Sequence, residues 1–154
     1  MISTIRHDSI FDKNSFNVPI TIIGAGATGS RVFLALVELG ITNITVIDFD
    51  KVEPHNLANQ AYVSSDIGHA KVGACEWLYS EKTGEAAPDC MKFILARVPS
   101  PETEDAVKGV VFLLTDTMAS RKEIFTESLK DNLDVQLVIE TRMASSYGNI
   151  LSFD

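Results

Sequence analysis

The chain has 154 residues, of which 45% are hydrophobic and 22% charged, a composition typical of one globular domain with a sizeable core. Its formal net charge of −8 argues against general nucleic-acid binding, which depends on a basic surface. The longest apolar runs have the length of strands and the N-terminus lacks a signal-like apolar region. We therefore expect a cytoplasmic protein that neither spans nor docks on a membrane.

The first 17 residues are polar and weakly patterned, which predicts an N-terminal arm or short strand before a domain over residues 18–154. An apolar run at Ile20–Ile23 then predicts a strand buried on both faces. Three glycines follow it and open a helix that runs to Leu39. Gly24 permits a tight turn, Gly26 lets a phosphate approach the backbone, and Gly29 lets the helix pack closely on the strand.

The helix leads to a second strand at Asn43–Ile47, which ends in Asp48. This acid follows the first glycine at about the spacing, roughly 20 residues, at which a carboxylate meets a ribose hydroxyl. Strand, glycines, helix, second strand and acid in this order predict a nucleotide site. The alternative is a helix packed tightly on a strand without any ligand. The segment over residues 50–71 does not show the hydrophobic periodicity of a helix or a strand. Long irregular segments in compact domains are usually functional, so this segment is a candidate part of the site.

Helical and strand patterns alternate through the rest of the chain, which predicts an α/β, Rossmann-like, doubly wound and mostly parallel sheet with helices on both faces. We expect helices at His69–Glu81, Pro101–Val107 and Ala119–Lys130, and strands at Met91–Leu95, Val110–Leu114 and Val135–Ile139. A turn then leads into a last apolar piece at Ile150–Phe153.

The two cysteines are too few for a disulfide framework or a four-cysteine zinc site. Cys75 is predicted to be a buried thiol and Cys90 an ordinary strand-edge residue. The periodicity of the helices predicts two inward apolar faces. One comprises Val72, Cys75, Trp77, Leu78 and Tyr79, and the other Ile124, Phe125 and Leu129.

Four acids follow three of the predicted strands, at the edge where α/β sheets bind ligands. They are Asp48, Asp50, Asp116 and Glu140. Two carboxylates near phosphates suggest Mg²⁺, which takes few carboxylates together with phosphate oxygens. The alternatives are that Asp50 is a loop acid and that Asp116 caps the next helix.

Cationic and amide side chains in the same region are suited to phosphate binding. Lys71 can supply positive charge, and Asn56 and Gln60 can donate hydrogen bonds. Lys71 can instead be a solvated helix lysine. Arg121 can reach the edge or pair with an acid. We expect His55 and His69 to be surface loop residues.

The stretch IDFDKVEPHNLANQ…DIGHAK, together with LLTDTMASR, resembles the signature of the ThiF/MoeB and ubiquitin-activating enzymes. That family uses MgATP to adenylate the C-terminal glycine of a ubiquitin-like or sulfur-carrier protein. By the resemblance, the glycines would hold the nucleotide, Asp48 the ribose, and Asp50 would lie near metal and phosphates. Phosphate would be bound by Asn56, Gln60 and Lys71, and Mg²⁺ by Asp116, with Asp116 and Lys71 as the catalytic residues.

The chain departs from the family pattern at several points. Asn59 stands where the family has a phosphate-binding arginine, and His55 replaces its serine. Arg121, Arg142 or a residue of a partner subunit are candidate substitutes for the arginine. By the resemblance, we expect these residues to lack the family's C-terminal half and its thioester cysteine, and family members are usually dimers. Two other hypotheses therefore stand beside adenylation: a nucleotide-binding but inactive subunit of a homo- or heterodimer, and an NAD-dependent oxidoreductase.

Overall fold

The computed structural model describes residues 9–143 and 148–153. The expected N-terminal arm therefore lies partly outside the described residues. Within it, residues 9–17 form turns and contain no strand, and the rings of Phe11 and Phe16 pack with centroids 5.6 Å apart. No helix in the described ranges is long and apolar enough to cross a membrane.

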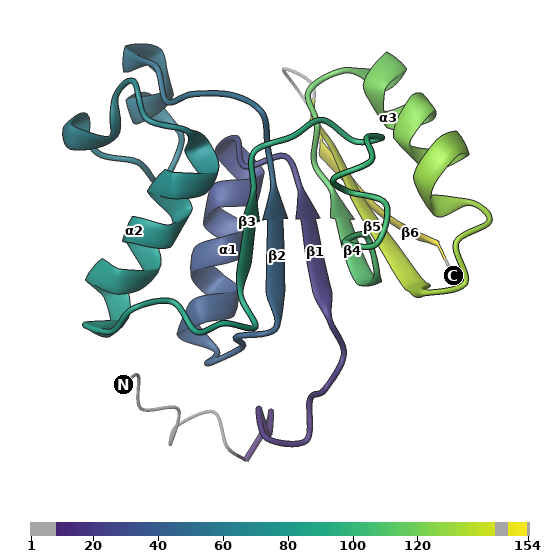
Figure 1. The fold of residues 1–154 in the computed structure, drawn as a ribbon, viewed down its shortest axis with the longest axis horizontal. Helices are drawn as coiled ribbons and strands as arrows, with labels where there is room; N and C mark the ends of the chain where they lie inside the picture. The colour runs from purple at the N-terminus through teal and green to yellow at the C-terminus, as the bar shows by residue number, and fades with distance from the viewer. Residues whose placement is uncertain (1–8, 144–147, 154) are drawn as a thin grey trace.

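A single six-stranded sheet runs through the centre of the molecule in the order β3-β2-β1-β4-β5-β6 (Figure 1). The first five strands pair in parallel, whereas β6 pairs antiparallel with β5. This confirms the predicted α/β class and the mostly parallel sheet. The strands are β1 (Ile20–Ile23), β2 (Ile44–Ile47), β3 (Lys92–Ile94), β4 (Gly109–Leu113), β5 (Val135–Met143) and β6 (Gly148–Phe153).

Helices cover both faces of the sheet, as predicted. Side chains alternate between the faces of a strand, so β1 and β2 contribute to two separate cores. Ile22 and Val46 pack under α1 (Ala27–Glu38) and α2 (Lys71–Thr83). On the opposite face, Ile23 and Ile47 belong to the core that includes residues of α3 (Met118–Ile124) and the π-helical turn Phe125–Leu129.

Four local predictions were wrong. Residues 101–106 form turns rather than a helix, because the segment has too few apolar side chains to bury a helical face. Trp77 is 44% exposed, with its ring edge-on to His69 at 4.7 Å, and Phe125 is 38% exposed. Glu140 lies within β5, opposite Leu151 of β6, because pairing with β6 extends the strand beyond its apolar run.

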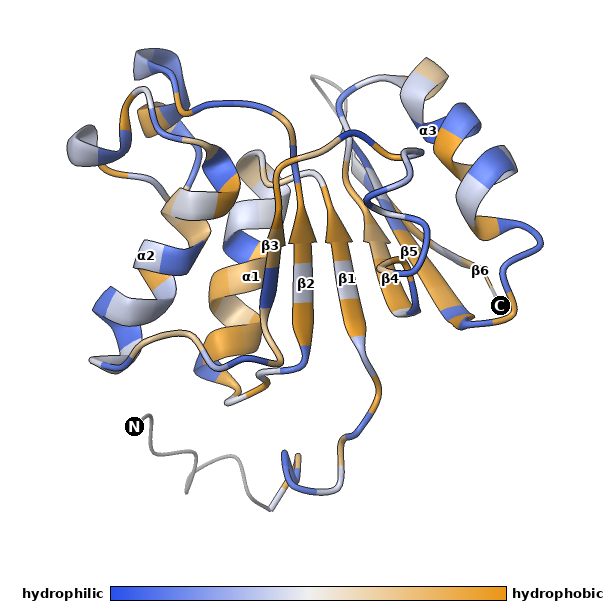
Figure 2. Ribbon diagram, in the orientation of Figure 1, coloured by the Kyte–Doolittle hydropathy of each residue, from blue (hydrophilic) through white to orange (hydrophobic). Residues whose placement is uncertain are grey.

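The order of the strands decides where a ligand can bind. The strands β1, β2 and β3 lie side by side in chain order. The chain then crosses back, and β4 pairs with the other side of β1. In such sheets the crevice lies beyond the carboxyl ends of the strands, where the order reverses. Figure 2 shows apolar strands through the centre and several polar segments in the loops at this edge.

Candidate functional site

The glycine turn after β1 has two glycines fixed by packing and one that faces open space. Gly24 has a φ of 97°, and a Cβ there would lie 2.9 Å from the carbonyl oxygen of Leu114. A Cβ on Gly29 would collide with the carbonyl oxygen of Gly24. A Cβ on Gly26 would meet no atom within 4 Å. The protein itself therefore does not require a glycine at position 26, whereas a ligand close to the backbone would.

The N-terminus of α1 opens toward this space. Gly26 is the N-cap residue, and no side chain caps the helix. The first helical hydrogen bond runs from Ser30 N to Gly26 O, so the preceding N–H groups have no partner within the helix. These groups and the helix dipole favour an anion.

The side chain of Asp48, directly after β2, forms a hydrogen bond with the glycine turn. Its carboxylate is buried, with Oδ2 accepting the N–H of Ala25 at 2.6 Å and Oδ1 accepting that of Asp50 at 2.7 Å. Asp48 thus has a structural role that sequence reasoning missed. It also lines the larger of the two cavities described below, so its predicted contact with a ribose stays a prediction.

The irregular loop over residues 51–70 is closed at its base by backbone pairing. Lys51 bridges Ala70, and Lys71 N donates to Asp50 O at 2.9 Å. This closure brings the two predicted phosphate-site residues together, with Lys71 Nζ 3.2 Å from Asp50 Oδ2. The side chain of Lys71 is only 9% exposed. The alternative of a solvated helix lysine is therefore wrong.

Amides within the loop have mixed roles. Asn56 is buried, and its Oδ1 accepts the N–H of Glu53 at 2.9 Å, which shapes the first turn of the loop. Gln60 is also buried, and its Oε1 has no hydrogen-bond partner within the described residues. Both residues line the same cavity. Their predicted contacts with phosphate stay predictions.

The end of the loop is tied to the glycine turn and α1. Ser30 Oγ accepts the N–H of Ala61 at 3.0 Å, and the Tyr62 hydroxyl donates to Ala25 O at 2.6 Å. Arg31 completes the attachment by donating from its guanidinium to Gln60 O at 3.1 Å.

Two neighbouring cavities lie at the carboxyl edge of the sheet, with volumes of about 380 and 320 Å³. The larger extends across the carboxyl ends of β1, β2 and β4, and the smaller lies under the loop. Both are lined by Gly26, Asp50, Lys71 and Asp116. The structure thus brings together four of the predicted site residues.

Asp116 is exposed and does not cap α3, which was the alternative role considered for it. Thr117 caps α3 instead, because its Oγ1 accepts the N–H of Ser120 at 3.1 Å. Asp50 and Asp116 line both cavities, but no cluster of three or more His, Cys, Asp or Glu side chains in the described ranges could hold a metal alone. Two carboxylates without further protein ligands fit Mg²⁺ that arrives with phosphates.

Arg121 and Arg142 both bind Glu140. Arg121 donates to Glu140 Oε1 at 3.2 Å and to Thr115 O at 2.7 Å, and Arg142 forms a second ion pair with the same carboxylate oxygen. The hydrogen bond from Arg142 is the main cause that lowers the pKa of Glu140 below its ordinary value. Neither arginine lines the cavities. Arg121 therefore pairs with an acid, and the ion pairs with Glu140 engage both arginines.

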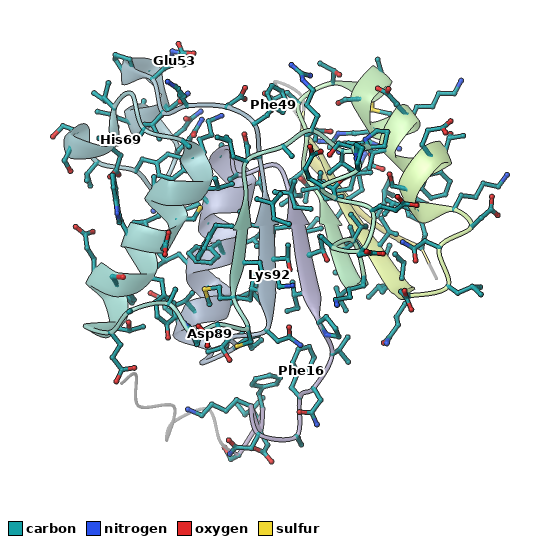
Figure 3. All side chains as sticks on the ribbon, in the orientation of Figure 1. Phe16, Phe49, Glu53, His69, Asp89 and Lys92 are labelled. Carbon is teal, nitrogen blue, oxygen red and sulfur yellow. The ribbon has the colours of Figure 1, made fainter. Side chains whose placement is uncertain are left out.

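Sequence reasoning missed two further residues of the larger cavity. The guanidinium carbon of Arg97 lies 3.6 Å from the ring centroid of Phe49, and both side chains line the wall. Figure 3 shows Phe49 at the carboxyl edge of the sheet. These loop residues are far apart in sequence, and only the pairing of β2 with β3 brings them together.

The model of the ThiF family matches residues 5–154. The chain belongs to the ThiF family. Among known members, it is similar to the ATP-dependent ubiquitin transferase-like protein Cap2 of Enterobacter hormaechei, with 29% identity over 87 residues. It is also similar to the probable adenylyltransferase/sulfurtransferase MoeZ of Mycobacterium tuberculosis, with 35% identity over 60 residues. These matches cover 56% and 38% of this chain, but only 14% and 15% of those proteins.

Solved structures share the fold of this ThiF-family chain. Escherichia coli MccB, solved with an ATP analogue and the peptide MccA, superposes with a TM-score of 0.67 at 20% identity. The tRNA N6-threonylcarbamoyladenosine dehydratase TcdA of E. coli, solved with AMP, gives a TM-score of 0.66 at 20% identity. The chain is covered to 82% and 80% by these matches, and it spans 37% and 50% of the two structures.

Proposed function

We propose that this ThiF-family chain binds MgATP in the two cavities and adenylates the C-terminal carboxylate of a ubiquitin-like or sulfur-carrier protein. One observation carries the proposal. Gly26, Asp50, Lys71 and Asp116 line both cavities, beside the uncapped N-terminus of α1. A backbone open to a ligand, a cation and two carboxylates together fit a nucleotide whose phosphates carry a metal ion.

In the proposed reaction, an oxygen of the carrier's carboxylate attacks the α-phosphorus of ATP. A P–O bond forms there, and the bond between the α-phosphorus and the bridging oxygen of pyrophosphate breaks. The protein aligns the groups and stabilises charge. Lys71 and the N–H groups of α1 would hold phosphate oxygens, and Asn56 and Gln60 would position them. Bound Mg²⁺, held by Asp50 and Asp116, would neutralise phosphate charge.

The choice of substrate rests on relatives that are much longer than this chain. MoeZ is named as a probable adenylyltransferase/sulfurtransferase, and Cap2 as a ubiquitin transferase-like protein. We also propose that residues 18–154 form the nucleotide-binding domain of a cytoplasmic homo- or heterodimer.

The test is exchange of labelled pyrophosphate into ATP in the presence of candidate carrier proteins. We expect carrier-dependent exchange that is lost in Asp116→Ala. The matched control is Asp89→Ala, because Asp89 is exposed at the opposite end of the sheet from Phe49 (Figure 3). Absence of exchange by the wild-type chain with every carrier would count against adenylation.

A second candidate function is nucleotide binding without turnover in a partner subunit. It is favoured by Asn59, which lines the smaller cavity in place of the family's phosphate-binding arginine. This function predicts ATP binding by calorimetry without pyrophosphate exchange. A thermal-shift comparison separates both candidates from an NAD-dependent oxidoreductase, since only the oxidoreductase would be stabilised more by NAD than by ATP.

A further inference from the structure

The side chain of Arg31 lies beside the smaller cavity, although it is not part of the glycine motif or the loop. It donates to the backbone oxygen of Gln60 at 3.1 Å, and Gln60 lines that cavity. Arg31 also follows Ala27, another lining residue, by one helical turn. Residues four apart share a helix face, and helical side chains lean toward the N-terminus. The guanidinium is therefore directed toward the phosphate-binding end of α1.

The hydrogen-bonding capacity of Arg31 is largely unused. A guanidinium has five N–H donors, and within the described residues Arg31 uses one and forms no ion pair. The other arginines around the sheet edge are engaged: Arg121 and Arg142 bind Glu140, and Arg97 lies on Phe49.

Acidic side chains outnumber lysines in the wall of the smaller cavity, so binding a triphosphate there requires another cation. Its walls carry three acids, Asp50, Glu53 and Asp116, but only two lysines, Lys51 and Lys71. One of those lysines, Lys71, already pairs with Asp50. A triphosphate would add several negative charges, which must be neutralised for binding.

We propose that Arg31 binds the phosphates of the nucleotide and supplies from α1 the guanidinium that is absent at Asn59. This inference rests on the proposed nucleotide site. Asn59 and Gln60 are neighbours in the wall of the smaller cavity, and the guanidinium of Arg31, which does not itself line the cavity, is hydrogen-bonded to the backbone of Gln60 from the helix side. A phosphate-binding guanidinium can thus come from position 59 on the loop or from Arg31 on α1.

The experiment compares the affinities for MgATP and adenosine of the wild-type chain, Arg31→Ala and Arg31→Gln, measured by calorimetry. We expect each substitution to weaken MgATP binding about tenfold to a hundredfold, the usual effect of losing a hydrogen bond to a charged group. Adenosine affinity should change less than about twofold, because adenosine lacks phosphates. Glutamine retains a donor for Gln60 O, so it separates phosphate binding from attachment of the loop. The control is Lys92→Gln, an exposed cation on β3 that lies away from the carboxyl edge in Figure 3.

A rescue variant makes the test specific. In Arg31→Ala with Asn59→Arg, the guanidinium returns at the loop position, and we expect MgATP affinity to recover. Unchanged MgATP affinity in Arg31→Ala would overturn the inference, as would an equal loss for adenosine and MgATP or full affinity in Arg31→Gln. If the wild-type chain binds no MgATP, the proposed function fails and this inference fails with it. If the wild-type chain binds MgATP and the Arg31 variants bind it with the same affinity, this inference fails while the proposed function stands.

Discussion

The ammonium nitrogen of Lys71 lies 3.2 Å from Oδ2 of Asp50, across the base of the loop over residues 51–70. The lysine is buried, while the aspartate side chain is 45% exposed and reaches the cavities. A buried cation with one anionic partner has capacity for a second. The pair is therefore a preformed phosphate position that also holds the loop closed.

Lys71→Met should weaken MgATP binding about tenfold to a hundredfold, because a charged hydrogen bond to phosphate is lost while the buried alkyl chain is replaced by one of similar size. Calorimetry measures this effect. Asp50→Asn should instead lower the free energy of unfolding by about 1–3 kcal/mol, since it leaves a buried ammonium without its charged partner. Urea denaturation of both variants checks the contrast, and unchanged stability of Asp50→Asn would show that the pair does not hold the loop.

Two glycine substitutions should separate packing from ligand binding. Gly29→Ala should destabilise the fold by about 2–4 kcal/mol, because its Cβ would collide with the backbone of Gly24. Gly26→Ala meets no protein atom, so it should change stability by less than about 1 kcal/mol while weakening MgATP binding. Denaturation and calorimetry on the same samples give both quantities. Undiminished ATP affinity in Gly26→Ala would show that no phosphate approaches this backbone.

The ion pairs of Glu140 should make stability depend on pH. Hydrogen bonds from Arg142 and Arg121 lower the pKa of Glu140 in the folded state. Their stabilisation is fully present above the ordinary carboxyl pKa and is lost as the pH falls through the lower folded value. Glu140→Gln should therefore cost about 2–4 kcal/mol at pH 7, with a difference from wild type that shrinks in acid.

Denaturation curves from pH 7 down to the acid limit of folding, with the exposed Glu127→Gln as control, test this dependence. A difference between Glu140→Gln and wild type that stays constant over the whole range would contradict the account of Glu140.

The two cysteines should differ in reactivity. Cys75 is fully buried, with its sulfur 3.6 Å from the Tyr62 hydroxyl, and burial raises its pKa to about 12. Cys90 is exposed. A disulfide reagent at pH 8 should modify one thiol in the native chain and two after denaturation. In Cys90→Ser the fast reaction should disappear, and its persistence would show that Cys75 is accessible.

Much of the fold was predictable because buried parallel strands appear in sequence as short apolar runs. The runs at Ile20–Ile23 and Ile44–Ile47 are fully buried in the structure. The inward-facing positions were less predictable. Trp77 and Phe125 are apolar and fit the helical period, yet neither is buried, since periodicity does not show where the neighbouring element ends.

The candidate site was predictable where residues follow strands directly, as Asp50 and Asp116 do. It was not predictable where a contact depends on tertiary structure. Arg31 is separated from Gln60 by 29 positions, and its place on an exposed helix surface is typical of a solvated charge. The pairing of Arg121 with Glu140 likewise depends on β4 and β5 being neighbours.

The most direct test of the account is a titration of the isotope-labelled chain with MgATP, followed through backbone amide NMR signals. We predict saturable shifts concentrated at Gly26, Asp50, Gln60 and Asp116, with weaker effects elsewhere. Absence of saturable shifts would contradict the nucleotide site. Shifts confined to the groove between residues 99–104 and 126–132, on the α3 side of the sheet, would contradict it equally.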